Sequence, residues 1–175
     1  MAAATETKVA GTGPRPHEDW NRLVDQLLSV YDKRHAARLN RIIQWVAVPL
    51  SVWAGIAVLA SLPVPPFMAA VPGLDWAVLA SILGVLVYAL FSVRIGLALA
   101  VFAAICIAIS WTYHKYGALP LWQPAIAIFT LSWVAGLIGD RIEGRPRKTT
   151  EIAIDLFMAP AAYLRHVLNV LRIGY

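Results

Sequence analysis

The sequence predicts an all-α membrane protein, a multi-pass bundle of about four transmembrane helices with an amphipathic interfacial helix at each end. Two observations support this fold class. Only three side chains between positions 42 and 139 are charged, Asp75, Arg94 and Lys115, although charged residues normally make up about a quarter of a globular domain. Hydrophobic residues account for 59% of the chain, and the uncharged runs are long enough to cross a bilayer. Such a block has to be dissolved in lipid.

The flanks of this block differ from it in composition. Residues 1–18 are rich in Ala, Thr, Gly and Pro and lack the apolar region of a secretory signal, which predicts a disordered tail. Residues 19–175 are expected to form a single membrane domain. The net charge of +5 belongs to the flanks and indicates attraction to anionic lipid headgroups, not a nucleic-acid surface. The single cysteine, Cys106, excludes a disulfide within the chain.

The first expected element is an interfacial helix over residues 20–41. Apolar side chains recur there at three- and four-residue spacing from Trp20 to Tyr31, and His35 continues the stripe. Another face carries three basic residues suited to headgroup phosphates, namely Arg34, Arg38 and Arg41.

Four uncharged runs then follow as predicted spans, each near the ~20 residues that a hydrocarbon core requires. They cover residues 42–62, 76–93, 95–113 and 121–138. Residues 76–113 as one helix would be about 57 Å long, almost twice the thickness of the core. A tight turn near residues 92–96 is therefore expected, with Arg94 at a membrane surface. In the alternative, Arg94 is an intramembrane charge with Asp75 as its candidate partner.

The distribution of basic residues predicts the topology. Seven Lys and Arg residues precede the first run, six follow the fourth, and the loop between the first and second runs has none. The positive-inside rule then favours an even number of spans, with both termini in the cytoplasm. The last element is a second interfacial helix, whose apolar stripe comprises Leu164, Val167, Leu168 and Leu171. A kink is expected at Ala159-Pro160.

Two polar clusters flank the charge-poor block, at residues 31–44 and 133–146. Four spans return the chain to the side from which it started, so the two clusters can meet at one membrane face. Asp140 and Glu143 are three residues apart and share a helical face. His35 and Gln44 are nine residues apart and point to opposite sides of a straight helix.

The spacing within both clusters resembles a known family. The first cluster has the pattern Tyr31, His35, Asn40 and then Pro49, and the second has Trp133, Gly139, Glu143, Gly144 and Pro146. In this pattern the chain resembles the yeast-type 2-hydroxy fatty acid dioxygenases, small multi-pass membrane proteins of phytosphingosine and odd-chain fatty acid metabolism. The family has histidines where this chain has Gln44 and Asp140, and a glutamine where it has Gly136.

The resemblance implies a cytosol-facing Fe(II) site that removes one carbon from a 2-hydroxy acyl chain by α-oxidation. The expected partners are therefore membrane lipids and a fatty acyl substrate. The candidate catalytic residues and metal ligands are His35, Asp140 and Glu143, with Gln44 as a weak fourth ligand or a structural residue. The candidate substrate contacts are Tyr31, Arg38 and Asn40. One imidazole with carboxylates would also suit another divalent metal, Mn or Mg.

A structural interpretation of each candidate stays open. His35 can be an interfacial histidine, Asp140 and Glu143 can pair with neighbouring arginines, and Asn40 can bond to backbone. The alternative function is a non-catalytic relative that binds lipid or organises the membrane after the loss of two family histidines. A transporter is less favoured, because the spans lack the charges that usually line a permeation path.

Overall fold

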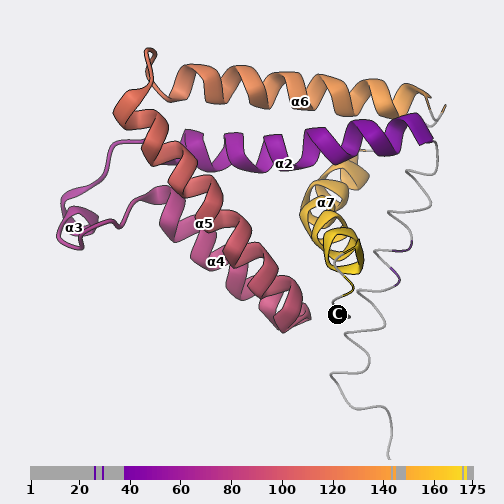
Figure 1. Cartoon of the computed structure of the whole chain (residues 1–175), viewed down its shortest axis with the longest axis horizontal. Coiled ribbons are helices and arrows are strands. Elements are labelled where there is room, and N and C mark those ends of the chain that lie inside the picture. Colours follow the sequence, from indigo (N-terminus) through magenta and orange to yellow (C-terminus); the bar gives the residue numbers. More distant parts are fainter. Residues whose placement is uncertain are drawn as a thin grey trace, which may run out of the picture.

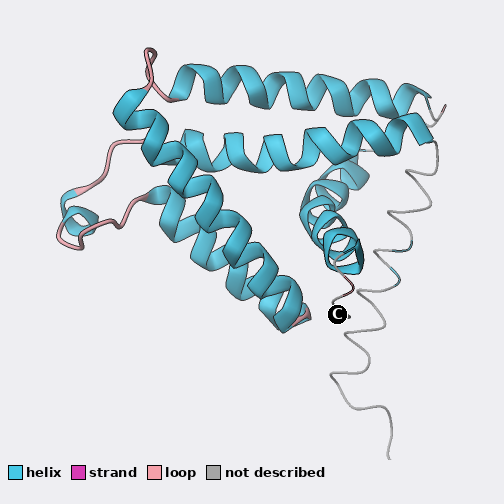
Figure 2. Cartoon of the chain, in the orientation of Figure 1, coloured by secondary structure: helices cyan, strands magenta, loops and turns pink. Residues whose placement is uncertain are grey.

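The computed structural model describes residues 26, 29, 38–142, 144, 149–170 and 172, and within these residues it is all-helical (Figure 2). The predicted fold class is thereby confirmed. The helices are α2 (Arg38–Ala60), α3 (Pro66–Ala69), α4 (Trp76–Phe91), α5 (Val93–Tyr116), α6 (Trp122–Ile142) and α7 (Thr149–Val170). The predicted tail over 1–18 lies outside the described residues, as does most of the predicted helix over 20–41.

Helices α2 and α6 lie side by side and run in opposite directions (Figure 1). Asn40 near the start of α2 meets Gly139 near the end of α6. At the other end Ala57 of α2 clusters with Leu121 and Ala125. The start of α2 and the end of α6, which border the charge-poor block, are therefore at the same end of the helix pair.

A seam of small residues accounts for this close pairing. The buried residues of α6 within the described chain are Ala125, Ser132 and Gly139, spaced by seven. Helix α2 buries a matching series with the same spacing, Asn40, Ala47 and Ala54. Seven residues are about two helical turns, so each series follows one line along its helix. Small residues on such a line let two membrane helices approach closely.

Helices α4 and α5 form an antiparallel hairpin joined by a single extended residue, Ser92 (φ −156°, ψ 120°). Next to this turn the two helices nearly touch, because a Cβ added at Gly96 would lie 2.8 Å from the Cβ of Ala89. The tight turn expected near residues 92–96 is confirmed. Arg94 follows it in the first turn of α5, with its side chain exposed.

The alternative pairing of Arg94 with Asp75 is wrong. Asp75 is the N-cap of α4, where its Oδ1 accepts a hydrogen bond of 2.8 Å from the backbone N–H of Val78. The whole of α4 separates it from the turn that carries Arg94. An N-terminal aspartate that accepts a free amide of the first turn is an ordinary capping arrangement, so this acidic residue has a structural role.

Among the residues that the structure describes, three helices are long and apolar enough to cross a membrane, namely α2, α5 and α6. They correspond to three of the four predicted spans. Helix α5 extends beyond its prediction at both ends, whereas α2 begins earlier and α6 ends later than predicted. Helix α4 matches the remaining prediction in position but has only 16 residues, which at 1.5 Å per residue is about 24 Å and shorter than a ~30 Å hydrocarbon core. The fourth span therefore stays a prediction, and α2, α5 and α6 are the candidate spans within the described residues.

Helix α7 packs against the other helices instead of standing apart from them. Its buried residues Met158, Ala161 and Leu164 share a core with Tyr88 of α4 and Ile95 of α5. The Tyr88 ring stacks on the Phe157 ring at 5.1 Å, and its hydroxyl donates a hydrogen bond to the Phe157 carbonyl.

The predicted apolar stripe of this helix largely coincides with its docking face. Leu164 and Leu168 are buried and Val167 is half-buried, whereas Leu171 lies outside the described residues. The helix continues through Pro160, where a kink was expected.

Candidate functional site

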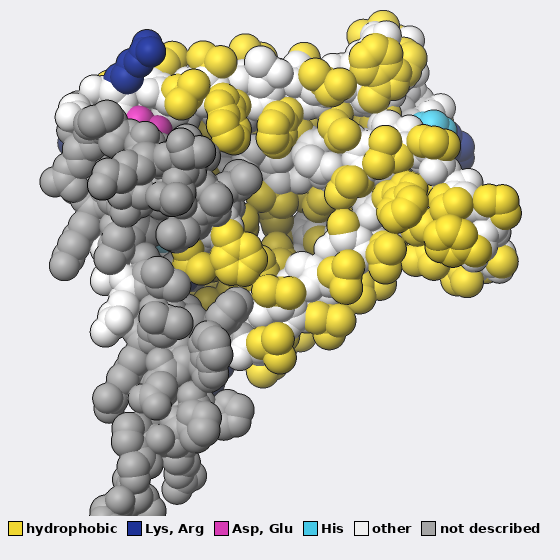
Figure 3. Space-filling model, turned by 180° about the vertical axis from the view of Figure 1, so that it is seen from behind, with side chains coloured by type: hydrophobic (Ala, Val, Ile, Leu, Met, Phe, Trp, Pro, Cys, Tyr) yellow, Lys and Arg dark blue, Asp and Glu magenta, His cyan; other side chains and the backbone are white. Residues whose placement is uncertain are grey.

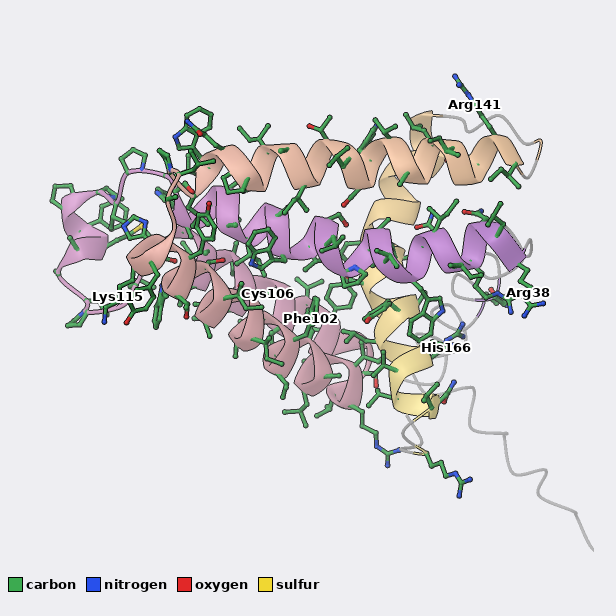
Figure 4. All side chains as sticks on the ribbon, turned by 45° about the horizontal axis from the view of Figure 1, so that its top comes forward. Arg38, Phe102, Cys106, Lys115, Arg141 and His166 are labelled. Atoms are coloured by element: carbon green, nitrogen blue, oxygen red, sulfur yellow. The ribbon has the colours of Figure 1, made fainter. Side chains whose placement is uncertain are left out.

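The described end of α2 and α6 that carries the two polar clusters is the candidate site. Asn40 is on the first turn of α2, and Gly139 with Asp140 is on the last turn and a half of α6. Arg38 and Arg141 are exposed at this same end, whereas Lys115 lies at the opposite end of the molecule (Figure 4). The antiparallel pairing therefore brings together segments that are about a hundred residues apart in the chain.

Asn40 is the one fully buried polar side chain among the described residues of this site. Its side chain is fully buried, at 0% exposure, and rests against the backbone of Gly139. A Cβ at position 139 would overlap the Asn40 Oδ1 and lie 3.0 Å from its Cγ. The amide oxygen therefore occupies the volume in front of the Gly139 Cα, where a Cα–H···O contact can form. Only glycine leaves room for this arrangement.

The Asn40 amide makes no hydrogen bond within the part of the chain that the structure describes, since both Oδ1 and Nδ2 are buried without a partner. Leaving a buried donor or acceptor without a partner typically destabilises the folded state by about 1–3 kcal/mol. A buried polar side chain of this kind calls for an explanation, either as a packing element or as a group reserved for a ligand.

Two further oxygen donors lie close to Asn40 along the two helices. Gln44 follows it by one helical turn on the same side of α2 and is half-buried. Asp140 follows Gly139 directly, is half-buried, and has its Oδ2 atom buried. Arg38, Arg41 and Arg141 are exposed around these residues. The end of the helix pair thus combines buried oxygen atoms with a basic, accessible surface.

The described residues contribute only part of the predicted site. Arg38, Asn40, Gln44 and Asp140 are all located at this end, as expected from an antiparallel pairing. Tyr31, His35 and Glu143, which include two of the three predicted metal ligands, lie outside the described residues.

The donor atoms that are described do not by themselves fit the iron site of the resembling family. Within the described residues there is no group of three or more His, Cys, Asp and Glu side chains. Asn40, Gln44 and Asp140 offer amide and carboxylate oxygens, which suit hard cations such as Mg²⁺, Ca²⁺ or Mn²⁺ better than an iron centre that depends on imidazole. The fit to iron therefore rests on His35.

An aromatic contact next to this site was not anticipated from the sequence. The ring of Trp45, which follows Gln44, makes edge-to-face contacts with Tyr163 at 5.4 Å and with His166 at 4.7 Å. Both partners are on α7, and Figure 4 shows His166 beside α2. Their separation by three residues places them on one helical face, which was the available signal. This spacing alone could not identify Trp45 as the partner, because the partner depends on how α7 docks.

Comparisons with protein-family models, with curated proteins and with solved structures find no match to this chain.

Proposed function

We propose that this chain is a membrane-embedded enzyme that modifies lipids, with a chemistry like that of the 2-hydroxy fatty acid dioxygenases. The observation that carries the proposal is the contact between Asn40 and Gly139. Each of these residues belongs to one of the two motifs on which the resemblance rests. A composite site needs both motifs at one end of the bundle, and this contact is at such an end.

In this proposal His35, Asp140 and Glu143 hold one divalent metal at the cytosolic face, with Gln44 beside them. The metal, in this proposal Fe(II), would supply the activation of O₂ for removal of one carbon from a 2-hydroxy acyl chain. The exposed Arg38, Arg41 and Arg141 around this end support the proposal, because guanidinium groups bind carboxylates and the substrate is an acid. Tyr31, Arg38 and Asn40 are the proposed substrate contacts.

The test uses the full chain purified in detergent. We expect about one equivalent of a transition metal per chain by elemental analysis. We also expect O₂-dependent conversion of a 2-hydroxy fatty acid to an acid shorter by one carbon. His35→Ala should abolish both. His114→Ala is the matched control, since His114 is exposed in the last turn of α5, at the opposite end. Absence of metal and of turnover in the unmodified protein would refute the enzymatic proposal.

One observation favours the alternative, a non-catalytic relative that binds lipid or organises the membrane. Asn40 is completely buried in the seam between α2 and α6, and in this alternative it serves packing instead of contacting a substrate. Gln44 and Asp140 also occupy positions that are histidines in the resembling family. If the unmodified protein is inactive but the variant with Gln44→His and Asp140→His gains iron and turnover, the fold is retained and the chemistry has been lost.

A further inference from the structure

The segment between α2 and α4, residues 61–75, exposes an unusual amount of apolar surface for a loop. Its four exposed large side chains are Leu62, Val64, Phe67 and Val71, and Phe67 within α3 is 72% exposed. No residue from 61 to 74 is charged. A contiguous apolar patch on a surface that faces water is uncommon in soluble proteins and marks an interaction site. Figure 3 shows hydrophobic side chains gathered over this segment, at the right of the view.

Few backbone N–H groups of the same segment lack a hydrogen-bond acceptor. Four of its fifteen residues are prolines, which have no N–H: Pro63, Pro65, Pro66 and Pro72. Seven others donate backbone hydrogen bonds within the segment or to the end of α2, namely Ser61, Leu62, Met68, Ala69, Ala70, Val71 and Leu74. Only four amide donors remain without a described backbone acceptor. A loop with so few free donors loses little when it leaves water.

Two contacts hold the segment against the helices. The Met68 side chain is buried, at 1% exposure, and anchors α3. The indole N–H of Trp76 donates a hydrogen bond of 3.0 Å to the carbonyl of Pro63, which ties the two ends of the segment together. Asp75, the only charged residue at its end, is already used as the cap of α4. The exposed apolar side chains are therefore presented by a structured loop.

We propose that residues 61–75 are embedded in the lipid interface of the membrane leaflet opposite the Asn40–Gly139 end. The patch continues the apolar surface of the spans, since Leu119, between α5 and α6, and Trp122, at the start of α6, are exposed on the same end of the molecule. The depth of the segment in the bilayer is limited by its four remaining amide donors, which are the backbone N–H groups of Val64, Phe67, Gly73 and Asp75. They require water or lipid carbonyls, which are present at the interface and absent from the hydrocarbon centre. Apolar burial, without basic residues, holds the segment there.

The experiment places single spin labels in the full chain, with Cys106→Ala, reconstituted in vesicles of phosphatidylcholine. Phe67→Cys carries the test label, because its exposed side chain can be replaced without disturbing the core. Lys115→Cys is the control at the same end of the molecule, on an exposed residue that normally carries a charge. We expect the ratio of collisions with oxygen to collisions with a water-soluble nickel complex to be several-fold higher at position 67 than at position 115. Added salt should leave this ratio unchanged.

Three outcomes would overturn the inference. A label at 67 that collides mainly with the nickel complex faces water. A label protected from both reagents is covered by protein, for which a second copy of this chain is the simplest source. Equal, oxygen-dominated collisions at 67 and 115 would place the entire end of the molecule in hydrocarbon, below the interfacial depth.

Discussion

Asn40 and Gly139 show how strongly one pair of residues can determine the approach of two membrane helices. The amide of Asn40 occupies the space that any side chain at position 139 would need. The neighbouring Gly136 lies on the same helix but has nothing within 4 Å of an added Cβ. The two glycines are therefore close in sequence and opposite in their tolerance of a methyl group.

Gly139→Ala should destabilise the protein, because the new methyl group has to displace a buried side chain. Overpacking of this kind costs about 1–3 kcal/mol. Gly136→Ala is the control, for which we expect no loss and a gain of up to about 1 kcal/mol from helix propensity. Thermal unfolding of both purified variants in one detergent measures the difference.

The double variant identifies the cause. Adding Asn40→Ala to Gly139→Ala should restore part of the lost stability, because the methyl group then has room. If the two substitutions are simply additive, Asn40 is not what excludes the methyl group. Loss of metal or turnover in Asn40→Ala alone would instead indicate that the amide is kept for a ligand.

The position of α7 depends on contacts with two separate elements. Trp45 of α2 holds it through Tyr163 and His166, and the tip of the α4–α5 hairpin holds it through Tyr88. Phe102 of α5 completes the connection, with its ring 6.3 Å from that of Tyr163. Helix α7 thus joins the N-terminal half of α2 to the hairpin.

Trp45→Ala should loosen α7. Each aromatic pair contributes about 0.5–1.5 kcal/mol beyond its buried area, so the loss of two pairs should raise local opening of residues 157–170. Hydrogen exchange measured by mass spectrometry reports this as faster deuterium uptake in that segment. Trp111→Ala is the control, since Trp111 is exposed on α5. Equal uptake in both variants would show that the hairpin alone holds α7.

Charge depletion in the sequence predicts the existence and order of the long helices well and their ends less well. Helix α5 continues through Lys115 to Tyr116, beyond the predicted limit at residue 113, and α6 continues through Asp140 and Arg141. Charged side chains mark where hydrocarbon ends, but an α-helix tolerates them and stops only at a breaker or a competing cap. The short helix α3 was not predicted, since its four residues carry no periodic signal.

The candidate site could be predicted only in outline. The even number of predicted spans indicated that residues near 40 and near 139 would lie at the same membrane face. It did not give the pairing of Asn40 with Gly139, because the register of two helices depends on packing along their whole length. The contact of His166 with Trp45 could not be predicted from the sequence for the same reason.

For the molecule as a whole, the antiparallel pairing of α2 and α6 places Arg38 and Arg41, near the start of α2, at the same end as Arg141, near the end of α6. Helices α4 and α5 run out and back as a hairpin, so this arrangement is the same whether or not α4 crosses the bilayer completely. The placement of both termini in the cytoplasm remains a prediction from the distribution of basic residues.

Cysteine accessibility in intact membranes tests this topology. Arg38→Cys and Arg141→Cys, both at exposed positions, should react with an impermeant maleimide from the same side. Leu119→Cys, exposed between α5 and α6, should react only from the other side. The native Cys106 is buried and should contribute little background. Reaction of the two arginine positions from opposite sides would contradict the antiparallel arrangement.

The Asn40–Gly139 contact has a consequence for how the protein is made. Helix α2 leaves the ribosome first, and its partner glycine follows ninety-nine residues later. During that interval the amide of Asn40 has no Gly139 to pack against, so the nascent helix has to expose it to lipid headgroups or to the insertion machinery. Arrival of α6 removes this exposure. A chain truncated before residue 122 would lack α6 and would keep the Asn40 amide without this cover.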